Sequence, residues 1–149
     1  MTVFRGSHEP DPRWEAFAAR EPYFAVLTAP EFLRANLTAA HERAFFESGE
    51  ELVDWFFHVI RRRLSSHFSS MSMLEYGCGV GRLAILLARR PGSVTAVDRS
   101  PAMLDAARRE AVRQGVSDIE FCTPDALFAT SRKFDLVTCF QVLQRVPPR

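Results

Sequence analysis

The chain has 149 residues, 19 lysines and arginines against 18 aspartates and glutamates, a formal net charge of +1 and 47% hydrophobic residues. This composition is typical of one globular domain, so it argues against disorder, collagen and coiled coils, and the near-neutral charge gives no reason to expect a nucleic-acid or anionic-membrane partner. No apolar run approaches the ~20 residues of a membrane helix and the N-terminus lacks an apolar signal segment, which favours a cytoplasmic protein.

Residues 1–70 are predicted to form a helical leader that precedes a second unit at residues 71–149. Nine of the 13 phenylalanines and all four histidines lie in this leader. Pro30 stands where a helix would begin, because proline is tolerated in the first helical turn. We expect short helices at residues 13–20, 30–37 and 38–47.

A fourth leader helix has the strongest sequence support. Ser48 and Glu51 have the spacing of a capping box, and apolar residues recur at helical spacing from Leu52 to Ile60. An arginine triplet at residues 61–63 falls in the last turn, where positive charge suits the helix dipole. We interpret the triplet as a solvated helix end rather than a binding patch.

After residue 70 the pattern changes to short apolar runs that alternate with amphipathic segments. Such alternation predicts an α/β fold, with a parallel sheet connected by right-handed crossover helices. Ser100 followed by Pro101 is a strong helix start, because serine caps well and proline fits the first helical position. Strands are expected at residues 71–76, 93–97, 119–122 and 134–139, helices at residues 81–90 and 100–114, and a third connecting segment at residues 125–133.

A glycine-rich turn carries the clearest chemical signal. Residues 75–82 (EYGCGVGR) follow the first predicted strand and open a helix, which is typical of a turn whose backbone approaches a nucleotide-containing cofactor. The next strand ends at Asp98, 21 residues beyond Gly77, where an acidic side chain accepts ribose hydroxyls in such folds. The alternative for Asp98 is a helix-capping or solvated carboxylate.

Glycine spacing and charge indicate which cofactor. The dinucleotide fingerprint requires glycine or alanine at the position of Arg82. Glu75 stands just before the turn, where its charge would repel a phosphate but attract an ammonium group or lie in the field of a sulfonium. S-adenosylmethionine, which has no phosphate, fits both facts, and an NAD(P)-dependent reductase is the less favoured alternative.

Five segments of the second unit carry a further signal: 75–82 (EYGCGVGR), 96–104 (AVDRSPAML), 124–126 (PDA), 134–137 (FDLV) and 142–147 (VLQRVP). Together they resemble the first four motifs of class I S-adenosylmethionine-dependent methyltransferases of the bacterial, small-molecule type. The resemblance covers about residues 71–149. Leader residues 21–28 and 45–50 resemble, less specifically, the leader of a bacterial subgroup of that family.

The resemblance implies a binding site for S-adenosylmethionine. The glycine turn would follow the methionine moiety, with Glu75 near its amino group, and Cys139 and Phe140 would lie beside the methyl group. A small buried strand residue is the alternative for Cys139. The implied cofactor-binding residues are Glu75, Tyr76, Gly77, Cys78, Gly79, Asp98, Arg99, Met103, Asp125, Ala126, Cys139 and Phe140.

At the adenosine end, the resemblance implies that Asp98 takes the ribose hydroxyls and that Arg99 flanks the adenine. Asp125 would accept from the adenine amino group, and Ala126 would offer its backbone amide. An ordinary turn residue is the alternative for Asp125. Family members often carry histidine at the position of Arg145, so no catalytic residue is carried over to this chain.

Other chemistries have less support. Cys78, Cys122 and Cys139 are widely spaced and every histidine lies far upstream, which argues against a disulfide framework and against a zinc or other metal site. The aromatic leader residues are interpreted as packing of the leader against the sheet, with a lid over the methyl-transfer site as the alternative. They are Tyr23, Phe24, Phe45 and Phe46.

The implied fold is a Rossmann-like sheet of strand order 3-2-1-4-5-7-6, of which this chain supplies the first four strands. We therefore expect strands ordered 3-2-1-4, an apparently truncated fold, and an exposed edge at strand four through which the chain can self-associate. The favoured function is methyl transfer from S-adenosylmethionine to an unknown small molecule. The alternative is a non-catalytic, truncated cofactor-binding fragment or interaction module.

Overall fold

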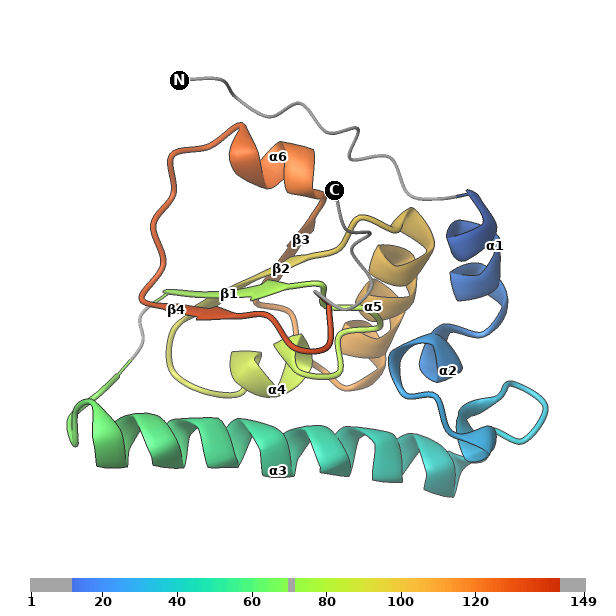
Figure 1. Ribbon diagram of the computed structural model, residues 1–149, viewed down its shortest axis with the longest axis horizontal. Coiled ribbons are helices and arrows are strands. Elements are labelled where there is room, and N and C mark those ends of the chain that lie inside the picture. The colour runs from blue at the N-terminus through green and yellow to red at the C-terminus, as the bar shows by residue number, and fades with distance from the viewer. Residues whose placement is uncertain (1–11, 70–71, 143–149) are drawn as a thin grey trace.

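A computed structural model describes residues 12–69 and 72–142. Its centre is a sheet of four parallel strands, ordered β3-β2-β1-β4 (Figure 1), which confirms the predicted strand order. Predictions that concern residue 71, the motif residues 143–147 and Arg145 lie outside the described residues. The strands are β1 (Ser72–Tyr76), β2 (Ser93–Val97), β3 (Ile119–Cys122) and β4 (Leu136–Thr138).

Strand β1 lies in the middle of the sheet, between β2 and β4. The start of β1 is joined to the residue before β4, because the Ser72 backbone amide and hydroxyl donate to Asp135 Oδ2 at 2.9 and 3.0 Å. The Asp135 amide donates back to the Ser72 carbonyl oxygen at 3.0 Å. This Ser72–Asp135 clamp sets the register in which β4 pairs with β1.

Strand β4 is shorter than predicted, because its pairing with β1 runs only from Met73↔Leu136 to Glu75↔Thr138. It lies at one edge of the described sheet, and the Val137 side chain there is 58% exposed. Self-association through this edge stays a prediction.

The leader contains α1 (Pro12–Arg20), α2 (Pro22–Val26), the 3₁₀ helix η1 (Pro30–Phe32) and α3 (Ala39–Arg63). The prediction of separate helices at residues 38–47 and from Ser48 onward is wrong, because α3 is one helix of 25 residues. Thr38 caps it by accepting from the His41 amide at 3.2 Å. The predicted helix at residues 30–37 is reduced to η1.

The continuity of α3 follows from its buried face. Phe45, Gly49, Val53 and Phe57 recur every four residues and are all buried, so one apolar stripe runs along the helix without interruption. Ser48 is not a cap, since its hydroxyl donates to the Phe45 carbonyl oxygen at 2.8 Å. The arginine triplet does fall in the last turn, as predicted.

The remaining helices follow the strands of the second unit. They are α4 (Ala84–Ala88), α5 (Pro101–Arg113) and α6 (Pro124–Phe128). Ser100 caps α5 by accepting from the Met103 amide at 3.1 Å, which confirms the predicted helix start. Figure 1 shows α4 between the sheet and α3, and α1 lies against α5.

The aromatic leader residues pack into the protein interior. Phe45 is 0% exposed, and the rings of Tyr23, Phe32 and Phe46 surround it at centroid distances of 4.9, 5.3 and 5.3 Å. The same cluster includes Ile85 of α4. Tyr23, Phe45 and Phe46 are thus packed in the interior, whereas Phe24 is only partly buried, and a lid over the methyl-transfer site stays a prediction. Of the helices formed by residues 12–69 and 72–142, none combines the length and apolar composition needed to cross a membrane.

Gly49 allows α3 to lie close to the segment that leads into α4. A Cβ atom at this position would lie 3.1 Å from the Arg82 carbonyl oxygen and 2.9 Å from Leu86 Cδ1. We expect Gly49→Val to lower the free energy of unfolding by about 2 kcal/mol, because the helices would have to separate. Urea denaturation measures this, and Glu51→Val on the exposed face of α3 is the matched control. Equal stability of both variants would contradict the close approach.

Candidate cofactor site

The glycine turn is built on backbone conformations that favour glycine. Gly77, Gly79 and Gly81 have φ angles of 81°, 54° and 82°, in the left-handed region that side chains disfavour. The amides of Gly77 and Cys78 donate to the Val97 carbonyl oxygen at 2.7 and 2.9 Å. The turn is therefore fixed against the carboxyl end of β2, at the edge where parallel α/β sheets bind ligands.

Two hydrophobic side chains lie directly over this turn. A Cβ atom on Gly77 would lie 2.2 Å from Val142 Cγ2, and one on Gly79 would lie 2.6 Å from Val26 Cγ2. Val26 comes from α2 of the leader, so the leader reaches the glycine turn. Both valines fall in segments that carry the resemblance, 21–28 and 142–147, but neither was among the predicted site residues.

Asp98 lies beside the glycine turn at the end of β2. Its Oδ2 accepts from the Gly79 amide at 2.8 Å, and its Oδ1 accepts from the Ser100 amide at 2.9 Å. Burial raises the pKa of Asp98, the amides of Ser100 and Gly79 lower it, and the charge of Glu15 raises it. Asp98 thus has a structural role as a local acceptor, and its position also lets it accept from a ligand at the turn.

Glu75, at the centre of the sheet, is a buried carboxyl group with unused hydrogen-bonding capacity. It is 3% exposed, and its Oε2 has no hydrogen-bond partner among the residues that the structure describes. Burial raises the pKa of Glu75 to about 8, the Ala84 amide and the charge of Arg82 lower it, and the charge of Asp98 raises it. A positively charged ligand group would supply the missing partner.

Tyr76, the last residue of β1, is affected electrostatically by four other predicted site residues. Burial raises the pKa of its hydroxyl, Cys139, Asp98 and Asp125 raise it further, and Arg99 lowers it. All four groups therefore lie within electrostatic range of the Tyr76 hydroxyl. Its ring packs against Phe128 of α6 at a centroid distance of 6.4 Å.

Other predicted site residues are engaged within the protein. Met103 is 2% exposed and belongs to the hydrophobic core. The Ala126 amide donates to the Thr123 hydroxyl at 3.4 Å. Phe140 packs against Phe56 of α3 at a centroid distance of 6.2 Å. Cys78 is also buried, so any ligand contact from these residues competes with a structural role.

Arg82 is a positioning residue that the sequence analysis missed. Its side chain donates to the Phe45 carbonyl oxygen at 3.2 Å and to the Ser48 hydroxyl at 3.0 Å, and the residue is only 7% exposed. The end of the glycine turn is thereby anchored to α3. In the sequence, Arg82 was used only to argue against a dinucleotide site. An arginine among apolar residues also indicates a buried side chain that is held by polar partners.

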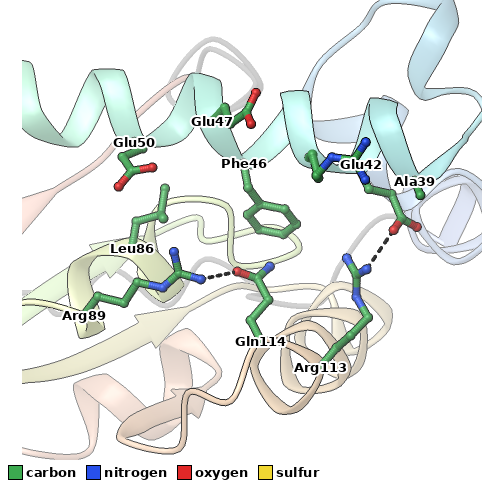
Figure 2. Close-up of a pocket in the computed structure, with 10 residues that line it drawn as sticks. Ala39, Glu42, Phe46, Glu47, Glu50, Leu86, Arg89, Arg113 and Gln114 are labelled. Carbon is green, nitrogen blue, oxygen red and sulfur yellow. Dashed lines mark hydrogen bonds and ion pairs between the residues drawn. The ribbon is translucent and has the colours of Figure 1, made fainter.

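A cavity of about 340 Å³ lies elsewhere, between α3, α4 and α5 (Figure 2). Its floor includes Phe46 and Leu86, and Arg113 forms an ion pair with Glu42 at 2.8 Å across one wall. None of the predicted site residues lines it. Within the described part of the chain, no group of three or more histidine, cysteine, aspartate or glutamate side chains is arranged to hold a metal ion.

Comparisons with known proteins agree with the fold and the glycine turn. A family described as "Methyltransferase domain" matches residues 67–148. The chain is 37% identical over 81 residues to ubiquinone biosynthesis O-methyltransferase of Coxiella burnetii, covering 50% of this chain and 32% of that protein. The Methylocella silvestris enzyme of the same name is 40% identical over 77 residues, covering 51% and 30%. The chain thus spans about a third of the length of these relatives.

A solved structure extends the likeness to the leader region. Magnesium protoporphyrin IX methyltransferase of Synechocystis PCC 6803, crystallised with bound SAH, is 26% identical with a TM-score of 0.50. The match covers 72% of this chain and 48% of that chain.

Proposed function

The chain belongs to the class I S-adenosylmethionine-dependent methyltransferase family, and from this premise we propose that it binds S-adenosylmethionine at the glycine turn and transfers the methyl group to a small-molecule acceptor. The observation that carries the proposal is the buried Glu75 carboxyl group, whose Oε2 lacks a partner among the described residues. It lies just before a glycine turn that is hydrogen-bonded to Asp98. A small-molecule acceptor is supported by the names of the relatives, which are enzymes of ubiquinone biosynthesis.

The residues present fit this cofactor. Glu75 offers a carboxyl group to the ammonium of the methionine moiety, and Asp98 offers acceptor lone pairs to the ribose hydroxyls. Arg99 and Asp125, both near Tyr76, flank the position proposed for adenine. The carboxylate of Asp98, and that of Glu75 once an ammonium partner ionises it, oppose a phosphate at this turn, which separates the site from a dinucleotide site.

The cofactor supplies an activated methyl group, so the protein needs neither a metal nor a nucleophile of its own. Its tasks are to align the acceptor with the methyl group, to exclude water and, where the acceptor requires it, to remove a proton. Cys139 lies close enough to Glu75 for that carboxyl group to raise the pKa of the Cys139 thiol, after the larger effect of burial. We therefore assign the end of β4 to the methyl-transfer side of the site, and we assign no general base.

Calorimetric titration with S-adenosylmethionine tests the proposal, with NADH as the control ligand. We expect micromolar binding of the first and no binding of the second. A folded sample that binds NADH but not S-adenosylmethionine would overturn the proposal in favour of a reductase. Incubation with metabolite extracts and methyl-labelled cofactor then tests transfer, and binding without transfer to any metabolite would favour the non-catalytic cofactor-binding alternative.

A further inference from the structure

We propose that Glu15 of the leader is an additional cofactor-binding residue. Together with Asp98, it accepts a hydrogen bond from a hydroxyl group of the nucleoside sugar. This inference rests on the proposed function, because it concerns the same cofactor. It goes beyond the matched family region, residues 67–148, since Glu15 lies outside that region.

Glu15, in α1, contacts the first turn of α5. Helix α1 lies against α5, and Glu15 Oε1 accepts from the Ala102 amide at 2.8 Å. Ala102 is in the first turn of α5, four residues after Asp98. The carboxylate of Glu15 therefore lies at the start of the helix that follows the ribose-binding aspartate.

The two carboxylate oxygens of Glu15 differ in their hydrogen bonding. Glu15 Oε2 is buried and has no hydrogen-bond partner among the described residues. One oxygen is enough to bind the Ala102 amide, so the second is not needed for that contact. A buried carboxylate oxygen without a donor is costly, and a ligand that donates a hydrogen bond would remove this cost.

Glu15 and Asp98 together favour a ligand that donates hydrogen bonds and carries no negative charge. The charge of Glu15 reaches Asp98, whose pKa it raises after the larger effect of burial. Two carboxylates next to each other repel an anion, and both can only accept hydrogen bonds when ionised. A pair of neighbouring hydroxyl groups, as in ribose, offers two donors without negative charge, so it fits this pair of acceptors better than a phosphate does.

Contacts from α2 and α3 hold the leader against α5 and the glycine turn. The Tyr23 hydroxyl of α2 donates to Glu110 Oε1 of α5, and Arg113 joins Glu110 to Glu42 of α3. Val26 packs over Gly79. These contacts fix α2 and α3 against α5 and the glycine turn, and α1 packs against both α2 and α5, so Glu15 is pre-organised for binding and need not move to reach the ligand.

The experiment compares Glu15→Gln with wild type in calorimetric titrations of S-adenosylhomocysteine and of its 2′-deoxy and 3′-deoxy analogues. Glutamine keeps an acceptor for the Ala102 amide but places an NH₂ donor where Oε2 stood. We expect affinity for S-adenosylhomocysteine to fall about tenfold or more, while affinity for one deoxy analogue changes less than threefold. Glu51→Gln, on the exposed face of α3, is the matched control and should bind as wild type does.

An equal loss for all three ligands would overturn the inference, because it would show a purely structural role for Glu15. Unchanged binding of S-adenosylhomocysteine would overturn it as well. Failure of the wild-type chain to bind any of the three would instead reject the proposed function itself. If Glu15→Gln does not fold by circular dichroism, Glu15→Asp keeps the charge but shortens the side chain, and the same selective loss is expected.

Discussion

Replacing Glu75 with glutamine is expected to abolish measurable cofactor binding and, above pH 8, to stabilise the folded chain. The pKa of Glu75 is about 8 in the folded state, against 4.5 for an unperturbed group. Between these two values the folded chain holds a proton that the unfolded chain has released, so stability falls as pH rises through this window. Above pH 8 the ionised, buried carboxylate costs about 5 kcal/mol at most, and glutamine removes that cost.

Urea denaturation at pH 5, 7 and 9 measures the stability difference between Glu75→Gln and wild type. The difference should be small at pH 5 and should grow in favour of the variant toward pH 9. Glu51→Gln, which removes an exposed carboxylate from α3, should follow the wild-type pH profile. Parallel profiles for Glu75→Gln and wild type would show that the buried carboxyl group does not titrate in this range.

The binding loss has a separate cause. In the proposed site, Glu75 is the partner of the cofactor ammonium, and removing one partner of a buried charge pair costs several kcal/mol. We expect affinity for S-adenosylmethionine to fall more than 100-fold. A variant that is more stable above pH 8 yet fails to bind would identify Glu75 as a residue retained for binding at the expense of stability. Retained affinity would remove Glu75 from the site.

The second large effect is expected for Asp98→Asn, which should lower affinity for S-adenosylmethionine about 100-fold. Asp98 accepts from the amides of both Gly79 and Ser100. Asparagine has one acceptor oxygen and one NH₂ donor, so one of these amides would face a donor. The variant therefore loses the charged acceptor for ribose and also disturbs the glycine turn.

Calorimetric titration measures the affinity of Asp98→Asn, and thermal denaturation measures its stability, so that a loss of binding can be distinguished from a loss of folding. We expect Asp98→Asn to unfold about 1–3 kcal/mol more easily, which is the cost of one unpaired buried amide. Asp105→Asn is the matched control, since Asp105 is exposed on α5 and pairs with Arg108. Wild-type affinity in Asp98→Asn would assign Asp98 to turn stabilisation alone.

The sheet and the glycine turn were predictable because their signals are local. Strands β2 and β3 have the predicted bounds, and the Ser100–Pro101 helix start holds. Each depends on residues that are adjacent in sequence, such as an apolar run or a cap followed by proline. Glu75 and Asp98 were candidates for the same reason, because Glu75 is the next-to-last residue of β1 and Asp98 directly follows β2.

The errors come from residues whose local preference is overridden by distant contacts. Ser48 followed by Gly49 resembles a helix boundary, yet Ser48 accepts from Arg82 and Gly49 admits the Arg82 backbone close to α3. Glu15 likewise forms its contact 87 positions along the chain, with Ala102. Neither capping rules nor periodicity describes such pairs, so the site residues of the leader could be found only in three dimensions.

The Ser72–Asp135 clamp has a consequence for the order of folding. It joins residues 63 positions apart, whereas β1 meets β2 at Ser72↔Ser93, only 21 positions apart. Closing the longer loop costs about 1 kcal/mol more chain entropy, so β1 and β2 should pair before β4 arrives. The Gly79–Asp98 contact spans 19 positions and belongs to the earlier step. The ribose side of the proposed site can therefore form in a folding nucleus that precedes the proposed methyl-transfer side.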